Sequence, residues 1–173
     1  MNTRKTVYGA IILGIAIALP GLFHGTGLPG NIFLPMHLPI FIGGMLLGPL
    51  YGLLLGLLAP IINFFIFTMP PIPILYVMVF ELMAYGFISG LVYKKTNKLF
   101  LSLIISMVIG RIVAALVVLA LTKILTGFDA NPLIWFKGSF VTALPGIILQ
   151  LFLVPIIVSR SKKVYKTIFK VLG

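Results

Sequence analysis

Residues 38–67 read LPIFIGGMLLGPLYGLLLGLLAPIINFFIF, and this uncharged stretch decides how the chain is organised. A single helix of about 30 residues would be about 45 Å long, well beyond the ~30 Å hydrocarbon core of a bilayer. The segment Gly48–Gly52, GPLYG, lies at its middle and offers a turn. The stretch therefore predicts either two short spans, 38–49 and 52–67, or one long tilted helix.

Composition places the whole chain in a membrane. Of its 173 residues, 61% are hydrophobic and 9% are charged, whereas soluble domains carry about 25% charged residues. A water-facing surface cannot be built from this composition, so most of the outer surface must face lipid. We predict an all-α polytopic membrane protein with a single domain, 1–173.

The positions of the basic residues distinguish between the two interpretations of residues 38–67. Four further apolar runs predict the spans 7–23, 74–93, 99–121 and 138–158. If 38–49 and 52–67 are two spans joined by a turn, the chain has six spans. The N-terminus, the Lys94–Lys98 turn and the C-terminal tail then lie on one side of the membrane. That side collects most of the thirteen basic residues: Arg4, Lys5, Lys94, Lys95, Lys98, Arg160, Lys162, Lys163, Lys166 and Lys170. The positive-inside rule therefore favours six transmembrane helices with both termini in the cytoplasm.

The beginning of the chain allows one other interpretation. Arg4 and Lys5 before an apolar run, with Ala16 and Ala18 as an A-x-A site, also fit a cleavable signal peptide. We disfavour cleavage because it would leave five spans and nothing soluble to export.

Between the first two spans, residues Pro20–Pro39 are rich in proline and glycine yet keep many apolar side chains. Such a segment is not expected to form a regular helix. An apolar, irregular backbone needs partners for its polar groups, so it must be buried in protein or lie at the interface. We expect a structured outer loop, or cap, over the bundle. The segment Thr122–Lys137 is expected to be a polar outer loop.

Catalysis is not expected from these residues. The chain has no Cys, two His and two acids, Glu81 and Asp129, and it contains neither G-x-S-x-G nor a phosphate-binding G-x-x-x-x-G-K-[ST] motif. We therefore predict no enzyme activity, no metal site and no cofactor. The net charge of +11 does not indicate nucleic-acid binding, because the basic residues form short clusters outside the apolar runs.

Polar side chains collect in the outer half of the predicted bundle, and the inner half has almost none. A polar, aromatic-lined cavity under the cap is the simplest arrangement that gives them partners. The candidate substrate contacts are His24, Asn31, His37, Asn63, Tyr76, Glu81, Tyr85, Arg111, Trp135 and Gln150.

Several of these residues have a plainer interpretation. Glu81 and Arg111 lie in neighbouring spans and either face the ligand or only pair with each other. His37 is either a ligand contact or a cap residue with its own partners. Trp135 and Tyr76 also fit as interfacial anchors.

Small residues form stripes along three helices. Ala10, Gly14 and Ala18 recur every four residues, and so do Gly86 and Gly90. A third stripe is Gly138, Thr142 and Gly146. Such stripes let helices approach closely. Most are expected to serve internal packing, whereas the first could be the docking face for another membrane subunit.

The chain resembles the substrate-binding subunits (S components) of bacterial energy-coupling-factor vitamin transporters. The resemblance covers size, six spans, cytoplasmic termini and the apolar loop after the first span. Residues 36–44 (MHLPIFIGG), 47–52 (LGPLYG) and 56–60 (GLLAP) look like the second and third helices of that family, and residues 80–86 (FELMAYG) look like its fourth. The family's first helix carries alanines at A-x-x-x-A spacing for docking, and Ala10, Gly14 and Ala18 match it with glycine in the central place.

The resemblance implies capture of a water-soluble vitamin or precursor from outside. Transport would need an energizing transmembrane subunit and two ATPase subunits on other chains. A pyridoxine-type compound suits the residues best, with pantothenate, folate and cobalamin as the next candidates. Two alternatives remain: a stand-alone small transporter or channel, which would need a polar path through the inner half, and a non-transporting assembly subunit, which would not need Glu81 and Arg111 in mid-membrane.

Overall fold

The computed structural model describes residues 3–26, 30–125 and 130–171, and these residues form helices without strands. The helices are α1 (Thr3–Gly25), α2 (Gly30–Phe33), α3 (His37–Leu47), α4 (Pro49–Phe67), α5 (Ile74–Thr96), α6 (Leu99–Ile124), α7 (Pro132–Thr142) and α8 (Leu144–Val171). Five of them are long and apolar enough to cross a membrane: α1, α4, α5, α6 and the Leu144–Ser161 part of α8.

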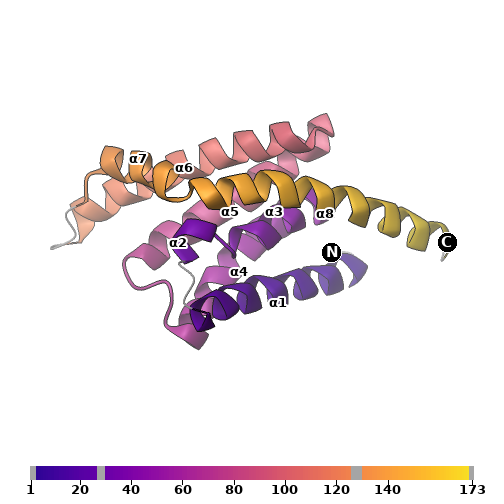
Figure 1. Cartoon of the computed structure of the whole chain (residues 1–173), viewed down its shortest axis with the longest axis horizontal. Coiled ribbons are helices and arrows are strands. Elements are labelled where there is room, and N and C mark those ends of the chain that lie inside the picture. The colour runs from indigo at the N-terminus through magenta and orange to yellow at the C-terminus, as the bar shows by residue number, and fades with distance from the viewer. Residues whose placement is uncertain (1–2, 27–29, 126–129, 172–173) are drawn as a thin grey trace.

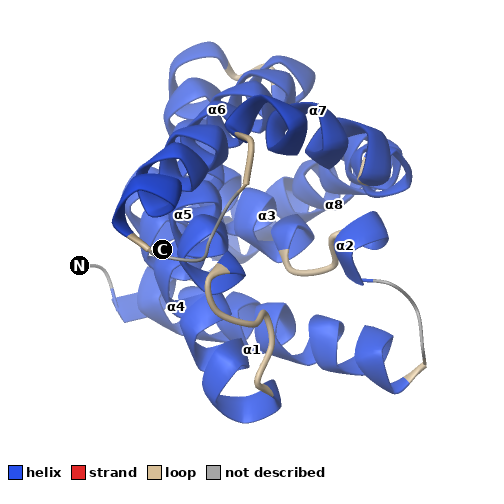
Figure 2. Ribbon diagram, turned by 90° about the vertical axis from the view of Figure 1, so that its left-hand side faces the viewer, coloured by secondary structure: helices blue, strands red, loops and turns tan. Residues whose placement is uncertain are grey.

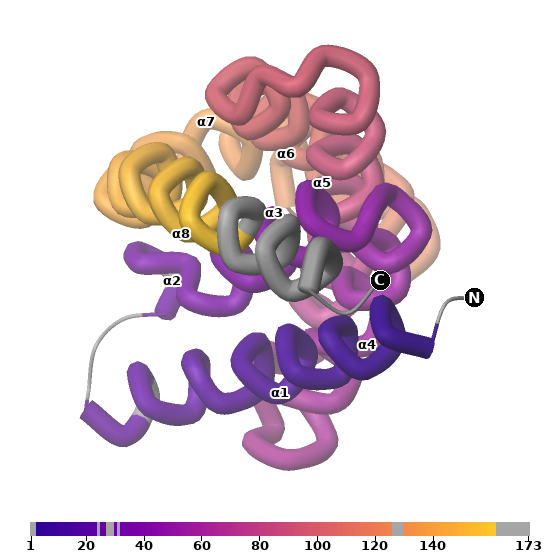
Figure 3. Tube along the Cα trace, turned by 90° about the vertical axis from the view of Figure 1, so that its right-hand side faces the viewer, coloured from indigo at the N-terminus to yellow at the C-terminus, as the bar shows by residue number. Residues whose placement is uncertain are grey.

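Helix α3 lies in the middle of the bundle. It packs against α1, α4, α5 and α8, which surround it in Figures 2 and 3. Nearly all of its residues are buried, including Ile40 and Phe41, which are fully enclosed. The most apolar short stretch of the chain thus becomes the centre of the core rather than a lipid-facing surface.

The chain reverses direction at Gly48, within the segment where the sequence offered a turn. Gly48 has a φ of 106°, a backbone conformation that glycine adopts readily, and α4 begins at the next residue, Pro49. Gly44 and Gly52 face each other across the turn, so α3 and α4 form an antiparallel hairpin. However, the 11 residues of α3 reach only about 16 Å, roughly half of a bilayer core. Six full spans therefore remain a prediction.

Glycines bring α4 and α5 into backbone contact. A Cβ atom on Gly52 would collide with the carbonyl oxygen of Gly86, and one on Gly56 with that of Leu82. Gly90 meets the backbone of Gly44 and Pro49 in the same way. The stripe of Gly86 and Gly90 therefore serves internal packing, which is the usual role of small residues in membrane helices.

The expectation that Pro20–Pro39 forms no regular helix was wrong at the start of this segment. Helix α1 continues through Pro20 to Gly25, and the irregular part of the cap is confined to the region around the short helix α2. Proline lacks an N–H and leaves the carbonyl four residues earlier without its helical partner. That carbonyl belongs to Ala16, and the side-chain Nδ2 of Asn63 donates to it at 3.3 Å. A residue of α4 thus makes a proline inside α1 tolerable.

The expected outer loop 122–137 and last span 138–158 also need correction. Helix α6 runs to Ile124, and α7 begins at Pro132. Asn131 caps α7, because its Oδ1 accepts hydrogen bonds from the backbone N–H of Leu133 at 2.9 Å and of Ile134 at 3.2 Å. The chain breaks again at Ala143, and α8 starts at Leu144.

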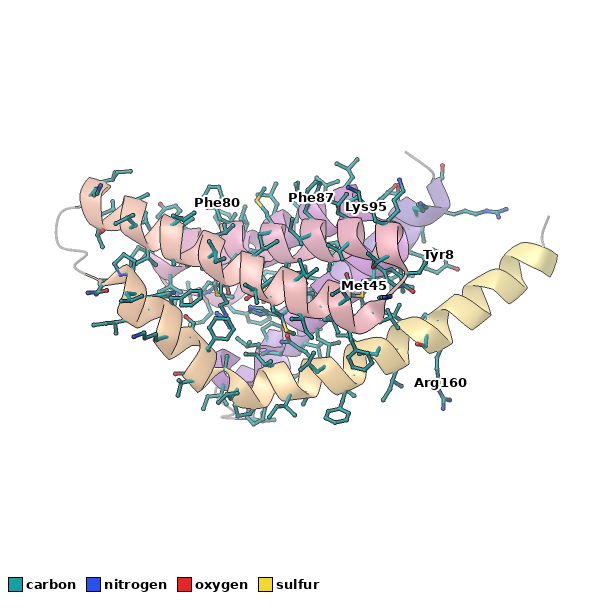
Figure 4. All side chains as sticks on the ribbon, turned by 90° about the horizontal axis from the view of Figure 1, so that it is seen from above. Tyr8, Met45, Phe80, Phe87, Lys95 and Arg160 are labelled. Atoms are coloured by element: carbon teal, nitrogen blue, oxygen red, sulfur yellow. The ribbon has the colours of Figure 1, made fainter. Side chains whose placement is uncertain are left out.

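The two chain ends lie at the same end of the bundle (Figure 1). Lys95, Tyr8 and Arg160 lie toward that end as well (Figure 4). Three basic clusters far apart in sequence therefore gather at one end, as the positive-inside argument requires.

Candidate functional site

A cavity of about 690 Å³ opens at the end of the bundle away from the chain termini. Pockets of 300–1,000 Å³ are typical of small-molecule sites. Its walls come from the end of α1, the cap around α2, the start of α3, the second half of α4, the loop before α5, and parts of α5, α6 and α7. The lining residues are Pro20, Gly30, Leu34, Pro35, Met36, His37, Asn63, Met69, Pro70, Pro71, Ile74, Val77, Met78, Glu81, Arg111, Trp135, Gly138, Ser139, Thr142 and Ala143.

An ion pair lies on the floor of this cavity. Arg111 Nη1 contacts Glu81 Oε1 at 2.7 Å, and both side chains are almost fully buried. Tyr85 donates its hydroxyl to the same carboxylate oxygen, also at 2.7 Å. The second guanidinium nitrogen of Arg111, Nη2, is buried and has no partner. The Glu81–Arg111 ion pair, which the sequence suggested as one of two interpretations, is therefore present. It leaves Nη2 of Arg111 as a donor without an acceptor.

The aromatic packing around Tyr85 fixes the geometry of this pair. The Tyr85 ring lies 5.3 Å from the ring of His37 and 5.1 Å from that of Phe41, measured between centroids. The guanidinium carbon of Arg111 lies 5.9 Å from the centre of the Phe140 ring, within the range of a cation–π contact. This packing restricts the rotamers of Tyr85 and Arg111, so the ion pair is preorganised.

His37 begins α3 and is 3% exposed, yet neither of its ring nitrogens has a hydrogen-bond partner. A neutral imidazole carries one donor and one acceptor. Burying both without partners is unfavourable by roughly 1–3 kcal/mol for each group. His37 thus brings an unpaired donor and an unpaired acceptor to the lining of the cavity.

Asn63 also lines the cavity, and one end of its side-chain amide has no partner. Its Nδ2 donates to the carbonyl oxygens of Ala16 at 3.3 Å and of Ala59 at 3.0 Å, while its buried Oδ1 has no partner. The two carbonyls can only accept, so they fix which way the amide points. Oδ1 is therefore an acceptor without a donor.

Two helices each turn one face toward the cavity. Helix α5 contributes Ile74, Val77, Met78 and Glu81, and α7 contributes Trp135, Gly138, Ser139 and Thr142. Both sets follow the i, i+3, i+4, i+7 spacing of a helix face. The contribution of Ser139 and Thr142 was missed, because both were placed in a last span, 138–158, and Thr142 was assigned only to a stripe of small residues. The Asn-Pro pair at 131–132, a helix-start signal, could have revealed it.

Three predicted site residues lie outside the cavity. Tyr85 stands behind Glu81 and acts through it. Gln150 is buried under the cap, where its Nε2 donates to the carbonyl oxygen of Leu34 at 3.4 Å. Tyr76 is 44% exposed on the outer face of α5. The side chains of His24 and Asn31 lie outside the described residues.

The stripe of Ala10, Gly14 and Ala18 is exposed on α1. A Cβ atom on Gly14 would meet nothing within 4 Å. This stripe is therefore free of internal packing, unlike that of Gly86 and Gly90. In the part of the chain that the structure describes, no three His, Cys, Asp or Glu side chains lie close enough to hold a metal ion.

Comparison with known proteins gives one match. The family model described as "ECF transporter, substrate-specific component" matches residues 4–158. No curated protein and no solved structure matches the chain significantly. The match spans α1 to α7 and most of the membrane-crossing part of α8, so it includes every described wall of the cavity.

Proposed function

Since the chain belongs to the family of substrate-specific components of ECF transporters, we propose that it captures a water-soluble vitamin or vitamin precursor in the cavity beneath the cap. Members of this family are multi-pass membrane proteins that bind a substrate for a transporter and are not enzymes.

One observation supports the site above all others. Among the side chains that the structure describes, the buried polar atoms without a partner are the two ring nitrogens of His37, Oδ1 of Asn63 and Nη2 of Arg111, and all three residues line the same cavity. Native proteins rarely leave buried polar atoms unpaired. A ligand that pairs with all of them removes these penalties and gains affinity from doing so.

A pyridoxine-type compound is our first candidate for the ligand. It is a small polar ring that suits a cavity with a few polar atoms and a largely apolar wall. Trp135 offers an indole surface for ring stacking, and Met36 and Met78 offer sulfur atoms, which favour aromatic neighbours.

The proposed transport step depends on other chains. We assign docking on an energizing transmembrane subunit, associated with two ATPase subunits, to the exposed stripe of Ala10, Gly14 and Ala18. In this proposal the protein lies in a bacterial plasma membrane with both termini in the cytoplasm, and the cavity opens to the outside.

The proposal is tested by filling the cavity. Gly138 lines it, and a Cβ atom there meets nothing within 4 Å, so Gly138→Trp adds bulk without a backbone collision. We expect the purified variant to fold but to lose binding of pyridoxine by at least about tenfold in calorimetry. Native mass spectrometry should find a small molecule with the native protein and none with the variant.

Leu116→Trp is the matched control, because Leu116 is 60% exposed on α6 and does not line the cavity. It should bind like the native protein. Unchanged binding in Gly138→Trp would show that the ligand sits elsewhere.

A further inference from the structure

The lining of the cavity carries two charged side chains of opposite sign among its described residues. They are Glu81 and Arg111, and they neutralise each other at 2.7 Å. Lys137 lies next in sequence to Gly138, which lines the cavity, but Lys137 itself is exposed and does not line it. With His37 neutral, the cavity has no net charge to offer a ligand.

This pairing makes charged ligands unfavourable. An anion drawn to the unused Nη2 of Arg111 would also lie near the Glu81 carboxylate, and a cation drawn to Glu81 would lie near the guanidinium. Either one would bring an unmatched charge into a site lined mostly by proline, methionine and aliphatic side chains. Burial of an unmatched charge is strongly unfavourable, and like charges brought together suppress binding of the wrong partner.

The unpaired atoms are balanced in the same way. Nη2 of Arg111 donates, Oδ1 of Asn63 accepts, and neutral His37 supplies one donor and one acceptor. The ligand that satisfies them carries acceptors and donors in similar number. A ring with both hydroxyl groups and a ring nitrogen meets this requirement, whereas a carboxylate supplies acceptors alone.

We infer that Glu81 determines the charge selectivity of the cavity: by neutralising Arg111 it restricts the site to ring compounds without net charge and excludes their anionic and cationic relatives. This inference rests on the proposed function and adds to it the class of substrate. Among the candidates from the sequence, it favours pyridoxine and disfavours the anions pantothenate and folate.

The test compares three compounds that share one ring and differ in charge near neutral pH. Pyridoxine has no net charge, 4-pyridoxate is an anion and pyridoxamine is a cation. Affinities are measured by calorimetry on the purified full-length protein. We expect the native protein to bind pyridoxine at least about tenfold more tightly than either relative.

Variants then change the charge of the lining. Glu81→Gln leaves the charge of Arg111 uncompensated, so the affinity for 4-pyridoxate relative to pyridoxine should rise about tenfold or more. The double variant Glu81→Gln/Arg111→Gln is neutral again and should return to the native ratio. Lys137→Gln, a charge change on the exposed surface of α7, should leave the ratio unchanged.

Because Glu81→Gln strands a buried cation, it could fail to fold. Thr142→Lys is the second route, since Thr142 lines the cavity, is exposed at its edge and takes no part in the ion pair. It adds a positive charge without disturbing Glu81 and should also raise the relative affinity for 4-pyridoxate.

The outcomes separate this inference from the proposed function. If the native protein binds 4-pyridoxate as tightly as pyridoxine, or if neither Glu81→Gln nor Thr142→Lys changes the ratio, the inference is overturned while the binding site stands. If none of the three compounds binds, the pyridoxine assignment fails. The compound that native mass spectrometry finds with the protein then decides: a compound without net charge supports the inference, and an anion or a cation overturns it.

Discussion

Asn63 connects the fold to the site at the level of a single side chain. Its amide nitrogen donates to the Ala16 carbonyl that Pro20 leaves free, and its buried oxygen has no partner. Pro20 and Asn63 both line the cavity, and the asparagine supplies the hydrogen bond that the proline removes. The two residues should therefore depend on each other energetically.

We predict that Asn63→Leu lowers the free energy of unfolding by roughly 1–3 kcal/mol, because it leaves the Ala16 carbonyl buried without a partner. Pro20→Ala restores a backbone N–H that can bond this carbonyl. In a Pro20→Ala background the same Asn63→Leu change should cost about 1 kcal/mol less. Denaturant unfolding of the four proteins in detergent measures this difference, and equal losses in both backgrounds would disprove the coupling.

Sequence reasoning located the chemistry of the site but not every orientation. Glu81, Arg111, His37 and Asn63 were predicted because polar groups in an apolar chain must face one another. Gln150 was also expected in the cavity, but it does not line it. Its partner, the Leu34 carbonyl, belongs to the cap, whose path depends on contacts between distant segments that periodicity does not report.

At the scale of whole helices, α1 and α5 show two uses of the same small-residue spacing. Gly86 lies against Gly52 backbone to backbone, whereas Gly14 faces open space. The sequence alone could not separate these uses, because both are stripes with a spacing of four. Only the packing of α1, which touches α3 and α4 with one side, exposes Ala10, Gly14 and Ala18.

We predict that Gly14→Trp leaves the isolated protein folded and its ligand affinity unchanged, but abolishes uptake in cells. The indole has room in the isolated chain, and on the proposed docking face it would separate two helices that need close contact. Thermal stability and calorimetry of the purified variant, beside uptake of labelled ligand by cells that contain the complete transporter, give the measurements.

Gly86→Trp is the contrasting variant. It places the same side chain against the backbone of Gly52 and should prevent folding. If Gly14→Trp also failed to fold, or if it transported normally, the docking role of the α1 stripe would be wrong.

Helix boundaries were less predictable than helix identity. The spans at 74–93 and 99–121 correspond to α5 and α6 with a few residues added at the ends. Proline was a poor guide to helix ends, since α1 passes through Pro20 and α8 through Pro155. Proline ends a helix only when no other group takes its lost hydrogen bond, and that depends on tertiary packing.

At the scale of the whole molecule, the two ends of the bundle differ in character. One end holds the cavity with its buried polar groups, and the other holds the termini, Lys95 and the Gly48 turn. At the second end, Lys5 Nζ donates to the Leu47 carbonyl at 3.4 Å, and the hydroxyls of Thr6 and Tyr51 lie 3.2 Å apart. The turn between α3 and α4 is thus tied to the start of α1, so it must lie on the same side of the membrane as the N-terminus.

This arrangement predicts the topology of the chain. A reporter domain fused after Tyr51 should lie in the cytoplasm, and one fused after Met69, in the loop that lines the cavity, should lie outside. The reason is that basic clusters remain on the cytoplasmic side, and here they share one end with the Gly48 turn. Enzymatic reporters active on only one side of the membrane measure both positions, with a fusion after Lys98 as the cytoplasmic control. If the fusion after Tyr51 lay outside while the fusion after Lys98 lay in the cytoplasm, the turn between α3 and α4 would not be on the cytoplasmic side. The proposed opening of the cavity to the outside would then lose its basis.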